Sequence, residues 1–430
     1  MPRARFSPRP VTAEIIAVGS ELLLGGRTDS NSLWITEELA ALGIEVRFKS
    51  VVGDDEADIV RAVKTAVSRV TIVIMTGGLG PTVDDCTREA IARATGRRLA
   101  RRKEALDAMR TRLAQWGRTP NKGQLRQALI PAGATVVSNP VGSAPGFWLS
   151  SRGATVVSLP GVPTEMTAMM RESVAPLLAS QLEDRRQRPA PIRRQVFHTW
   201  GLPEADVDAK LQGLITRNAP IDLGFLASPL GVLVSLTTKP CKGASGDMLA
   251  SLSDAVRERL HEWIFAEGTD SMEAVIGRLL IEAKRTVALA ESCTGGLIGH
   301  RLTQVPGSSA YVDRGVISYS NQAKIELLGV PADLIERNGA VSAEVAAAMA
   351  KGIRERSGAS IGVSVTGIAG PGGATATKPV GLVYVALNAD NGDAVTREHR
   401  FHGDRSVIKQ RSSQAALDLL RRWLLKQGSR

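Results

Sequence analysis

The sequence is poor in cysteine and contains no long apolar run. Its three cysteines in 430 residues, Cys86, Cys241 and Cys293, are too few and too scattered for a disulfide framework or a zinc site. No stretch approaches the roughly 20 apolar residues of a membrane-spanning helix. The basic, proline-rich stretch 1–11 lacks the apolar core of a secretory signal. We therefore expect a cytoplasmic protein, in a reducing compartment and without a membrane partner.

The sequence is also poor in aromatic residues, which make up 4% of it. It therefore offers few of the stacking platforms that single-stranded nucleic acid uses. A formal net charge of +11 would suit a nucleic acid. The arginines, however, are spread along the chain, and their densest group, at 185–194, flanks two prolines as a linker does. We do not expect a nucleic-acid partner, since small anionic nucleotides suit the charge equally well.

What is present describes a soluble α/β protein of two or three domains. Short apolar runs at 14–18, 44–52 and 70–75 are typical of buried strands, and helical patterns separate them. Strands and helices that alternate at this spacing predict a doubly wound, mostly parallel sheet over residues 12–184. Ligands bind such sheets beyond the carboxyl ends of the strands, where the loop 76–87 lies.

This loop has the composition of a phosphate site. Glycines such as Gly77 and Gly78 let backbone N–H groups approach a phosphate, and a helix starting at Thr87 would point its positive end at an anion. The adjacent carboxylates of Asp84 and Asp85 would hold a hard divalent cation, or they only cap the helix. The loop alone leaves both interpretations open.

Residues 190–268 follow a β-α-β-β-α order, which predicts a KH-like module. An RNA-binding KH domain clamps the nucleic acid backbone with a Gly-x-x-Gly loop. No such loop lies between suitable helices here. The segment is therefore interpreted as a spacer or an assembly surface.

Residues 270–430 form a second α/β pattern. A strand at 286–290, a glycine loop at 291–296 and a helix at 297–304 are typical of a phosphate cradle, although Gly295 and Gly296 would also suit a plain tight turn. Cys293 lies beside the expected helix N-terminus, where a thiol pKa can fall. Its one nearby histidine, His300, is on the same helix, so a catalytic cysteine is not favoured.

The stretch 306–324 places a serine turn, a strand and then a tyrosine and a lysine in sequence. A serine hydroxyl needs a base to become a nucleophile. A lysine serves as that base only when burial or a neighbouring dipole lowers its amine pKa. Spacing cannot show that Ser309 and Lys324 touch, because the strand between them spans roughly 20 Å. Ser308 is the nearest competitor for nucleophile.

Five motifs in this half occur in the order found in the C-terminal domain of the CinA family, the nicotinamide mononucleotide deamidases, which it closely resembles. They are AESCTGG at 290–296, the stretch 306–324, VTGIAGPGG at 365–373, KPVG at 378–381 and FHGDR at 401–405. The resemblance implies an amidohydrolase that converts nicotinamide mononucleotide to nicotinate mononucleotide and ammonia without a cofactor.

The resemblance also implies roles for single residues of this domain. Ser309 would attack the carboxamide, Lys324 would take its proton, and Tyr319 would relay that proton. Arg405 would meet the phosphate, although a surface salt bridge with Asp404 is an equal alternative. The implied substrate-binding residues are Ser292, Thr294, Gly295, Gly296, Thr366, Gly367, Gly370 and Arg405.

The first half resembles the N-terminal half of CinA proteins, which is related to molybdopterin-binding domains. The matching stretches are 77–87, NPVGSAPG at 139–146 and LPGVPTEM at 159–166. The resemblance implies an ADP-ribose pyrophosphatase that depends on Mg²⁺, Mn²⁺ or Co²⁺. It implies metal ligands at Asp84 and Asp85, and nucleotide contacts from Gly77, Gly78, Thr82 and Asn139.

Two alternatives to this pair of activities stay open at this point. One is a non-enzymatic protein associated with competence for DNA uptake, and the other is a molybdopterin-handling protein. A homodimer is expected in each case.

Overall fold

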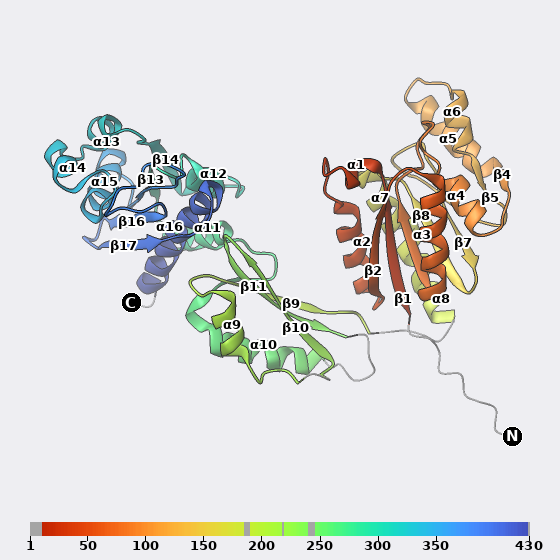
Figure 1. The fold of residues 1–430 in the computed structure, drawn as a ribbon, viewed down its shortest axis with the longest axis horizontal. Helices are drawn as coiled ribbons and strands as arrows, with labels where there is room; N and C mark the ends of the chain where they lie inside the picture. The colour runs from red at the N-terminus through yellow and green to blue at the C-terminus, as the bar shows by residue number, and fades with distance from the viewer. Residues whose placement is uncertain (1–10, 185–189, 217–218, 240–245, 429–430) are drawn as a thin grey trace. The chain divides into compact units, whose positions relative to one another are not determined.

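The computed structural model describes residues 11–184, 190–216, 219–239 and 246–428. Cys241, the expected tail 1–10 and the linker arginines at 185–188 lie outside the described residues. The chain divides into two compact units, which Figure 1 colours from red to blue along the chain. The N-terminal unit comprises Met1–Arg193 with Thr237–Ser245, and the C-terminal unit comprises Arg194–Leu236 with Gly246–Arg430.

The N-terminal unit is built on a six-stranded sheet of order β2-β1-β3-β8-β7-β6. The first four of these strands are parallel to one another. β7 is antiparallel to β8, and β6 is antiparallel to β7. Their bounds are β1 (Thr12–Val18), β2 (Glu45–Val52), β3 (Ile72–Thr76), β6 (Thr135–Val137), β7 (Gly146–Ser151) and β8 (Ala154–Leu159). The predicted doubly wound, mostly parallel sheet is therefore confirmed.

Apolar cores lie on both faces of this sheet, because alternate residues of each strand point to opposite sides. In β1, Ile16 and Val18 join the core beneath α3 (Glu56–Arg69), α4 (Thr87–Ala94) and α5 (Lys103–Gln115). Ala13 and Ile15 join the core beneath α2 (Ser30–Ala41), α7 (Pro163–Met169), the π-helical turn η1 (Met170–Val174) and α8 (Ala175–Asp184). The smaller elements are α1 (Ser20–Leu23), α6 (Lys122–Arg126) and the antiparallel pair β4 (Leu99–Arg101) and β5 (Leu129–Pro131).

The middle module has the predicted β-α-β-β-α order and adds one strand. Its sheet has the order β10-β11-β9-β12. Both α9 and α10 pack on the apolar side chains of that sheet. The bounds are β9 (Arg194–Thr199), α9 (Glu204–Leu211), β10 (Ile221–Ser228), β11 (Gly231–Thr238), α10 (Gly246–Leu260), the 3-10 helix η2 (His261–Trp263) and β12 (Ile264–Glu267).

The C-terminal domain is built on a five-stranded sheet of order β14-β13-β15-β16-β17. β14, β13 and β15 are parallel, and β16 and β17 are antiparallel strands at the other edge. The strand bounds are β13 (Val287–Glu291), β14 (Val312–Ile317), β15 (Ile361–Gly367), β16 (Leu382–Ala389) and β17 (Ala394–Arg400).

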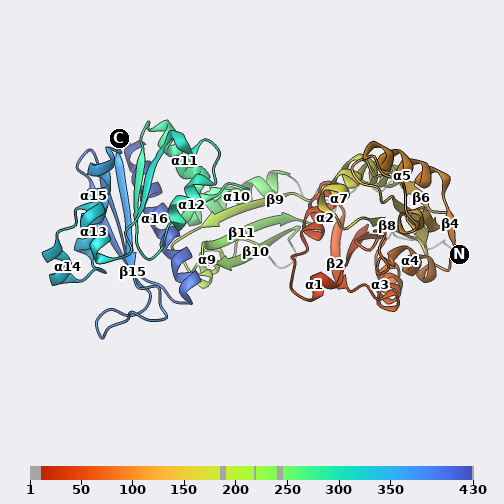
Figure 2. The same ribbon diagram turned by 90° about the horizontal axis from the view of Figure 1, so that it is seen from above.

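Helices cover both faces of this sheet, and Figure 2 shows it between α15 and α16. On one face lie α11, α12 and α16, around the core that contains Leu289 and Val385. On the other lie α13, α14 and α15. The helix bounds are α11 (Met272–Glu282), α12 (Leu297–Thr303), the 3-10 helix η3 (Ser308–Ala310), α13 (Asn321–Leu328), α14 (Ala332–Asn338), α15 (Ala343–Ser357) and α16 (Arg405–Gly428).

Strand β13, the second in the sheet order, sets the position of the candidate site in this domain. It pairs with β14 on one side and β15 on the other, so that Glu291 lies opposite both Ile317 and Val365. The three carboxyl ends therefore meet at one edge of the sheet, where ligands bind in open α/β folds. Within the described part of the chain, every helix is too short or too polar to cross a bilayer.

Candidate functional site

A pocket of about 220 Å³ opens at the carboxyl ends of β13, β14 and β15. Side chains that immediately follow these strands form its walls, and the glycine-rich loop after β15 closes one side. The predicted site residues that line it are Ser292, Tyr319, Lys324, Thr366, Gly367, Gly370 and Arg405. The fold thus brings seven predicted residues together from four separate segments.

A serine and a lysine meet at the floor of this pocket. Lys324 Nζ lies 3.2 Å from Ser292 Oγ, 2.9 Å from the Ser318 carbonyl oxygen and 3.4 Å from that of Tyr319. Lys324 is only 1% exposed and Ser292 is 8% exposed. Ser292 is held by its own backbone N–H, which donates to the Val365 carbonyl oxygen at 3.0 Å. The pair is therefore buried and fixed in place.

Burial sets the protonation behaviour of this floor. Desolvation lowers the pKa of the Lys324 ammonium, because the charged form loses its water. No carboxylate forms a salt bridge with Lys324 within the ranges that the structure describes. Burial also raises the pKa of the neighbouring Cys293 thiol to about 12. Cys293 is thus a protonated thiol at neutral pH. The pKa of Lys324 is shifted in the direction that favours its neutral form.

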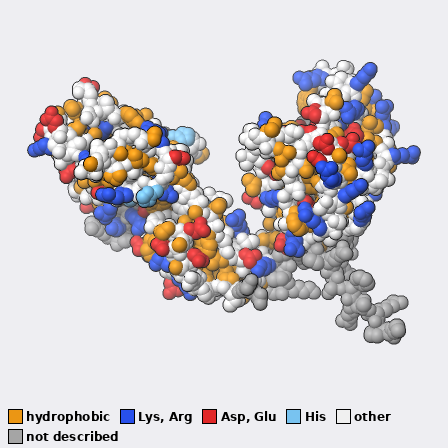
Figure 3. Space-filling model, viewed as in Figure 1, with side chains coloured by type: hydrophobic (Ala, Val, Ile, Leu, Met, Phe, Trp, Pro, Cys, Tyr) orange, Lys and Arg blue, Asp and Glu red, His pale blue; other side chains and the backbone are white. Residues whose placement is uncertain are grey.

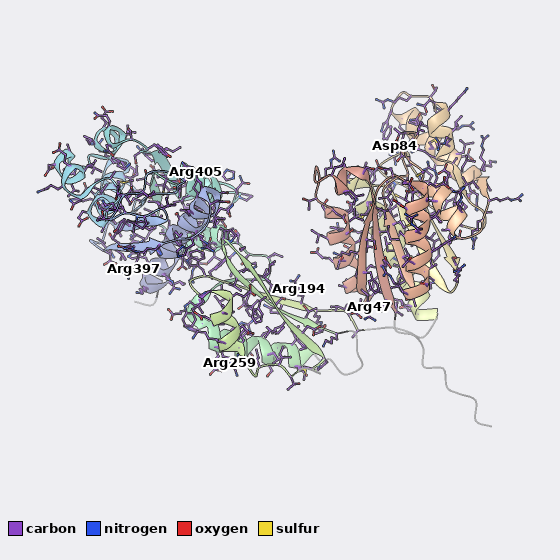
Figure 4. The ribbon with its side chains drawn as sticks, viewed as in Figure 1. Arg47, Asp84, Arg194, Arg259, Arg397 and Arg405 are labelled. Atoms are coloured by element: carbon purple, nitrogen blue, oxygen red, sulfur yellow. The ribbon has the colours of Figure 1, made fainter. Side chains whose placement is uncertain are left out.

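The mouth of the pocket carries a charged clamp. Arg405, at the start of α16 (Figure 4), donates from Nη1 to the Gly370 carbonyl oxygen and from Nη2 to Tyr319 Oη, both at 2.7 Å. Tyr319 is 59% exposed, so its ring stands at the entrance. Asp404 instead accepts from the Val407 N–H at 2.9 Å. The alternative of a plain Asp404–Arg405 surface pair is therefore wrong for this structure.

The hydroxyl groups of Thr366, Thr294 and Ser318, near the pocket floor, differ in whether they have a hydrogen-bond partner. Thr366 Oγ1 donates to the Ala340 carbonyl oxygen at 2.8 Å, which ties β15 to the segment before α15. The hydroxyls of Thr294 and Ser318 are buried and have no hydrogen-bond partner among the described residues. Thr366 therefore supports the wall, and Thr294 and Ser318 keep free hydrogen-bonding capacity close to the Ser292–Lys324 pair.

The predicted phosphate cradle at α12 is wrong, because the protein's own carboxylate already fills it. Glu291 Oε2 accepts from the N–H groups of Gly296 (3.0 Å) and Ile298 (3.1 Å), and Oε1 accepts from Gly299 (2.9 Å). Those are the backbone donors that a phosphate at this helix N-terminus would need. Gly295 and Gly296 have φ of 61° and 94°, so they make the tight turn that was the alternative interpretation.

The predicted pair of Ser309 and Lys324 is not brought together within one chain. Ser309 is exposed on η3, at the amino end of β14, whereas Lys324 follows the carboxyl end of that strand. A six-residue strand separates them by roughly 20 Å. Sequence reasoning placed Ser292 among the binding residues and missed its contact with Lys324. The available signal was its place directly after a buried strand.

The N-terminal unit carries its candidate site at the equivalent edge of its own sheet. Gly77 and Gly78 have φ of 109° and 65°. A Cβ on Gly77 would lie 2.1 Å from the Val18 carbonyl oxygen, and one on Gly78 would lie 2.0 Å from Thr87 Oγ1. The loop therefore requires glycine here. Arg88, which sequence reasoning missed, supports the loop from below by donating to the carbonyl oxygens of Leu79 (2.7 Å) and Gly80 (3.1 Å).

The two predicted metal ligands differ in availability. Asp85 accepts hydrogen bonds from both the backbone N–H and the hydroxyl of Thr82, and so closes the turn. Asp84 is exposed, and the Thr82 hydroxyl lowers the pKa of its carboxyl group. No group of three potential metal-ligating side chains occurs in the described ranges. This donor set fits a hard ion that keeps water and phosphate oxygens as most of its ligands, as Mg²⁺ does.

Asn139 has a mainly structural place in this unit. Its amide nitrogen donates to Ala144 O (2.9 Å) and to Glu165 Oε2 (2.6 Å). Its Oδ1 accepts from the N–H groups of Val141 and Gly142. Nearby, Asn31 donates to Thr76 Oγ1 and Gly161 O at 2.9 Å, and its buried Oδ1 has no partner in the described residues. Asn31 is thus a buried polar group at this edge that the sequence analysis did not identify.

Comparison with known families divides the chain into three matched segments. Residues 269–424 match the CinA C-terminal domain, residues 14–180 a probable molybdopterin binding domain, and residues 194–266 the damage-inducible protein CinA KH domain.

Relatives of known sequence match almost the whole chain. A CinA-like protein of Geotalea uraniireducens is 42% identical over 411 residues, covering 95% of this chain and 97% of its own length. A putative competence-damage inducible protein of Halothermothrix orenii is 42% identical over 413 residues, covering 96% and 98%. Among solved structures, a competence/damage inducible protein from Agrobacterium tumefaciens is 44% identical, with a TM-score of 0.34, over 35% of this chain and 94% of that one.

The carboxylate that fills the α12 N-terminus generates a stability prediction. Glu291→Ala leaves three backbone N–H groups without their acceptor and should lower the free energy of unfolding by about 3 kcal/mol. Differential scanning calorimetry should show the transition of the C-terminal domain roughly 8 °C lower. Glu282→Ala removes an exposed carboxylate from α11 and should leave that transition in place. Equal shifts in the two variants would contradict the anchoring role of Glu291.

Proposed function

The chain belongs to the CinA family, and from that premise we propose that its C-terminal domain deamidates nicotinamide mononucleotide. The products are nicotinate mononucleotide and ammonia, so the reaction recycles pyridine nucleotides. One observation carries the proposal: a buried lysine amine lies 3.2 Å from a serine hydroxyl in a pocket at the strand ends. Nucleophilic amide hydrolysis requires such a hydroxyl with a base beside it.

The hydrogen-bond geometry suits Lys324 as the base in its neutral form. A neutral amine has two N–H groups and one lone pair. The two N–H groups have acceptors in the carbonyl oxygens of Ser318 (2.9 Å) and Tyr319 (3.4 Å). The lone pair is then left for the hydroxyl proton of Ser292. Ser292, and not Ser309, is therefore our nucleophile.

The reaction then follows as an acyl transfer in two halves. Ser292 Oγ attacks the carboxamide carbon while its proton moves to Lys324 Nζ. The C–N bond breaks, and the proton on Lys324 passes to the leaving nitrogen, which departs as ammonia. Lys324 next takes a proton from a water molecule, whose oxygen attacks the carbonyl carbon of the acyl-serine. The bond from that carbon to Ser292 Oγ then breaks, Lys324 returns its proton to Oγ, and the acid product leaves and ionises to the carboxylate. Backbone N–H groups of the loop 368–373 are our candidates for stabilising the oxyanion.

The clamp at the pocket mouth would bind the phosphate of the mononucleotide. Arg405 uses Nη1 and Nη2 on Gly370 O and Tyr319 Oη, which holds its guanidinium at the entrance. A guanidinium held in this way loses little entropy when a phosphate arrives. Tyr319 is in this proposal an orienting group for Arg405 and not the relay between serine and lysine.

A non-enzymatic role for the same domain accounts poorly for Lys324. Burying an amine without a carboxylate partner costs stability, and a merely structural position would be better filled by an apolar side chain. Release of ammonia from nicotinamide mononucleotide by the purified chain separates the two possibilities.

We also propose a second hydrolytic activity for the N-terminal unit, the metal-dependent cleavage of ADP-ribose to AMP and ribose 5-phosphate. The supporting observation is an exposed carboxylate, Asp84, in the glycine-containing loop that follows the carboxyl end of β3. Asp84 would hold the metal together with the outer oxygen of Asp85. A bound divalent ion supplies charge neutralisation for the diphosphate. Gly77, Gly78 and Thr82 would contact its oxygens.

The first prediction concerns the catalytic pair. Ser292→Ala and Lys324→Met should each lower kcat/KM for deamidation by at least ~10³-fold, which corresponds to about 4 kcal/mol. The double variant should be little worse, because neither group works alone. Ser309→Ala, an exposed serine, is the matched control and should keep more than about a third of the activity. Loss of activity in Ser309→Ala with retention in Ser292→Ala would contradict our nucleophile.

The second prediction concerns pH. Lys324 must be neutral to accept a proton, and burial lowers its pKa below the ordinary value of 10.5. Activity is therefore lost as pH falls through this lowered pKa and is regained as pH rises through it. A pH profile of kcat/KM should rise and level off below pH 10.5. A flat profile, or one that rises only above that value, would exclude Lys324 as the base.

The third prediction separates the two activities. Asp84→Asn should abolish metal-dependent release of AMP from ADP-ribose, because the remaining protein oxygen is partly used by Thr82. Deamidation should stay within a few-fold of wild type, since its site lies in the other compact unit. Asp107→Asn, which changes an exposed carboxylate on α5, should affect neither activity. Loss of both activities in Asp84→Asn would argue against two independent sites.

A further inference from the structure

A groove of about 950 Å³ lies between the middle module and the C-terminal domain, away from the candidate active site. We call it the α16 groove. Its walls are the Trp200–Gly201 turn, η2 with the start of β12, β17, and the second half of α16. Figure 4 labels Arg397, which lines this groove, on a part of the C-terminal domain remote from Arg405. The groove therefore belongs to neither proposed site.

The walls of the groove are fixed relative to one another by buried contacts. Arg421 is 4% exposed and Asp418 is 7% exposed, and they pair through Asp418 Oδ1 at 2.9 and 2.7 Å. Arg421 also donates across the boundary to the carbonyl oxygens of Ile264 and Glu262, both at 3.4 Å. Trp200 and Phe265 of the middle module pack on the core of the C-terminal domain. The groove is thus a built feature with a buried polar floor.

The charge of the groove is not balanced by its own carboxylates. Four basic side chains line it, against Asp418 and Glu262. Asp418 holds Arg421 and also Arg422 at 2.7 Å, and Glu262 holds Arg422 at 3.1 Å. Arg397 reaches only the Thr396 carbonyl oxygen at 3.5 Å, and neither Arg397 nor Lys426 has a salt-bridge partner within the described ranges. Two positive charges are left for an anion, and Figure 3 shows Lys and Arg side chains gathered over this part of the domain.

The same groove has apolar and aromatic walls. Trp200, Ile264 and Leu419 line it beside the charged groups. His399 also lines it and stacks on Phe401, with ring centroids 5.2 Å apart and planes inclined by 9°. Burial lowers the pKa of His399, so its ring adds no charge at neutral pH. A ligand that suits both the basic side chains and the apolar, aromatic wall of the groove has a phosphate and a flat, weakly polar ring.

We propose that the α16 groove binds a small nucleotide, with its phosphate at Arg397 and Lys426 and its base against the wall that contains Trp200. A groove of this size accommodates a nucleotide. The two basic side chains provide a phosphate site by charge alone, as Arg and Lys commonly do. Such a ligand contacts the middle module and the C-terminal domain together, which gives the middle module a binding role. The proposal does not depend on either hydrolytic activity.

The test is equilibrium dialysis of AMP against the full-length chain, with the number of sites per chain as the readout. Arg397→Gln with Lys426→Gln should remove one site, or weaken it at least ~10-fold, because both phosphate partners are neutralised. Arg400→Gln with Lys351→Gln is the matched control. It removes the same charge from β17 and α15 at positions outside the groove and should leave binding unchanged.

Several outcomes would overturn the proposal. One is an unchanged number and affinity of sites in Arg397→Gln with Lys426→Gln, and another is an equal loss in the control pair. A third is that a single-stranded RNA decamer, and not AMP, binds in a manner that depends on Arg397 and Lys426. Thermal unfolding curves show whether each variant is folded. If the double substitution lowers Tm, the single substitution Lys426→Gln, at an exposed position near the end of α16, serves as the test instead. Deamidation within about twofold of wild type separates this site from the active site.

Discussion

A buried amine that has only neutral partners is the constraint on which the C-terminal domain depends. Lys324 reaches the pocket floor from α13, and its three hydrogen-bond partners follow the ends of two strands, β13 and β14. Lys324 has no salt bridge among the residues that the structure describes, and desolvation lowers the pKa of its ammonium group. The same burial that lowers the pKa of the amine also raises the pKa of the neighbouring Cys293 thiol. In the proposed mechanism, this one physical effect favours the serine over the cysteine as the nucleophile.

Both candidate sites follow from the same geometric rule. In each unit the carboxyl ends of parallel strands meet at one edge, and glycine-containing loops lie there. The two loops differ in how their backbone groups are used. In the N-terminal unit, Gly77 and Gly78 are required by contacts with Val18 and Thr87. In the C-terminal domain, Glu291 occupies the helix N-terminus, and the open pocket lies on the other side of Ser292.

The walls of the α16 groove show that the middle module is in direct contact with the C-terminal domain, which a simple spacer would not need. Its 3-10 helix and last strand are held by Arg421 and Arg422 of α16. A plain linker does not need buried guanidinium contacts, because exposed loops satisfy their backbone groups with water. The groove that results is larger than the candidate active site and more basic than its carboxylates can balance.

The sequence by itself determined the class of fold, the order of the three segments and the location of the glycine loops. Apolar runs and their period are local properties, and the loop at 76–87 follows the carboxyl end of a parallel strand, as predicted. Only the tertiary structure decided which groups meet. Ser309 is closer to Lys324 along the chain than Ser292 is, yet β14 carries it to the far end of the sheet. Glu291 belongs to the loop that was predicted to hold a phosphate. In the structure its carboxylate accepts hydrogen bonds from three backbone N–H groups of that loop and of α12. Contacts of this kind depend on strand register and on burial, which join residues distant in sequence, and spacing along one chain does not encode them.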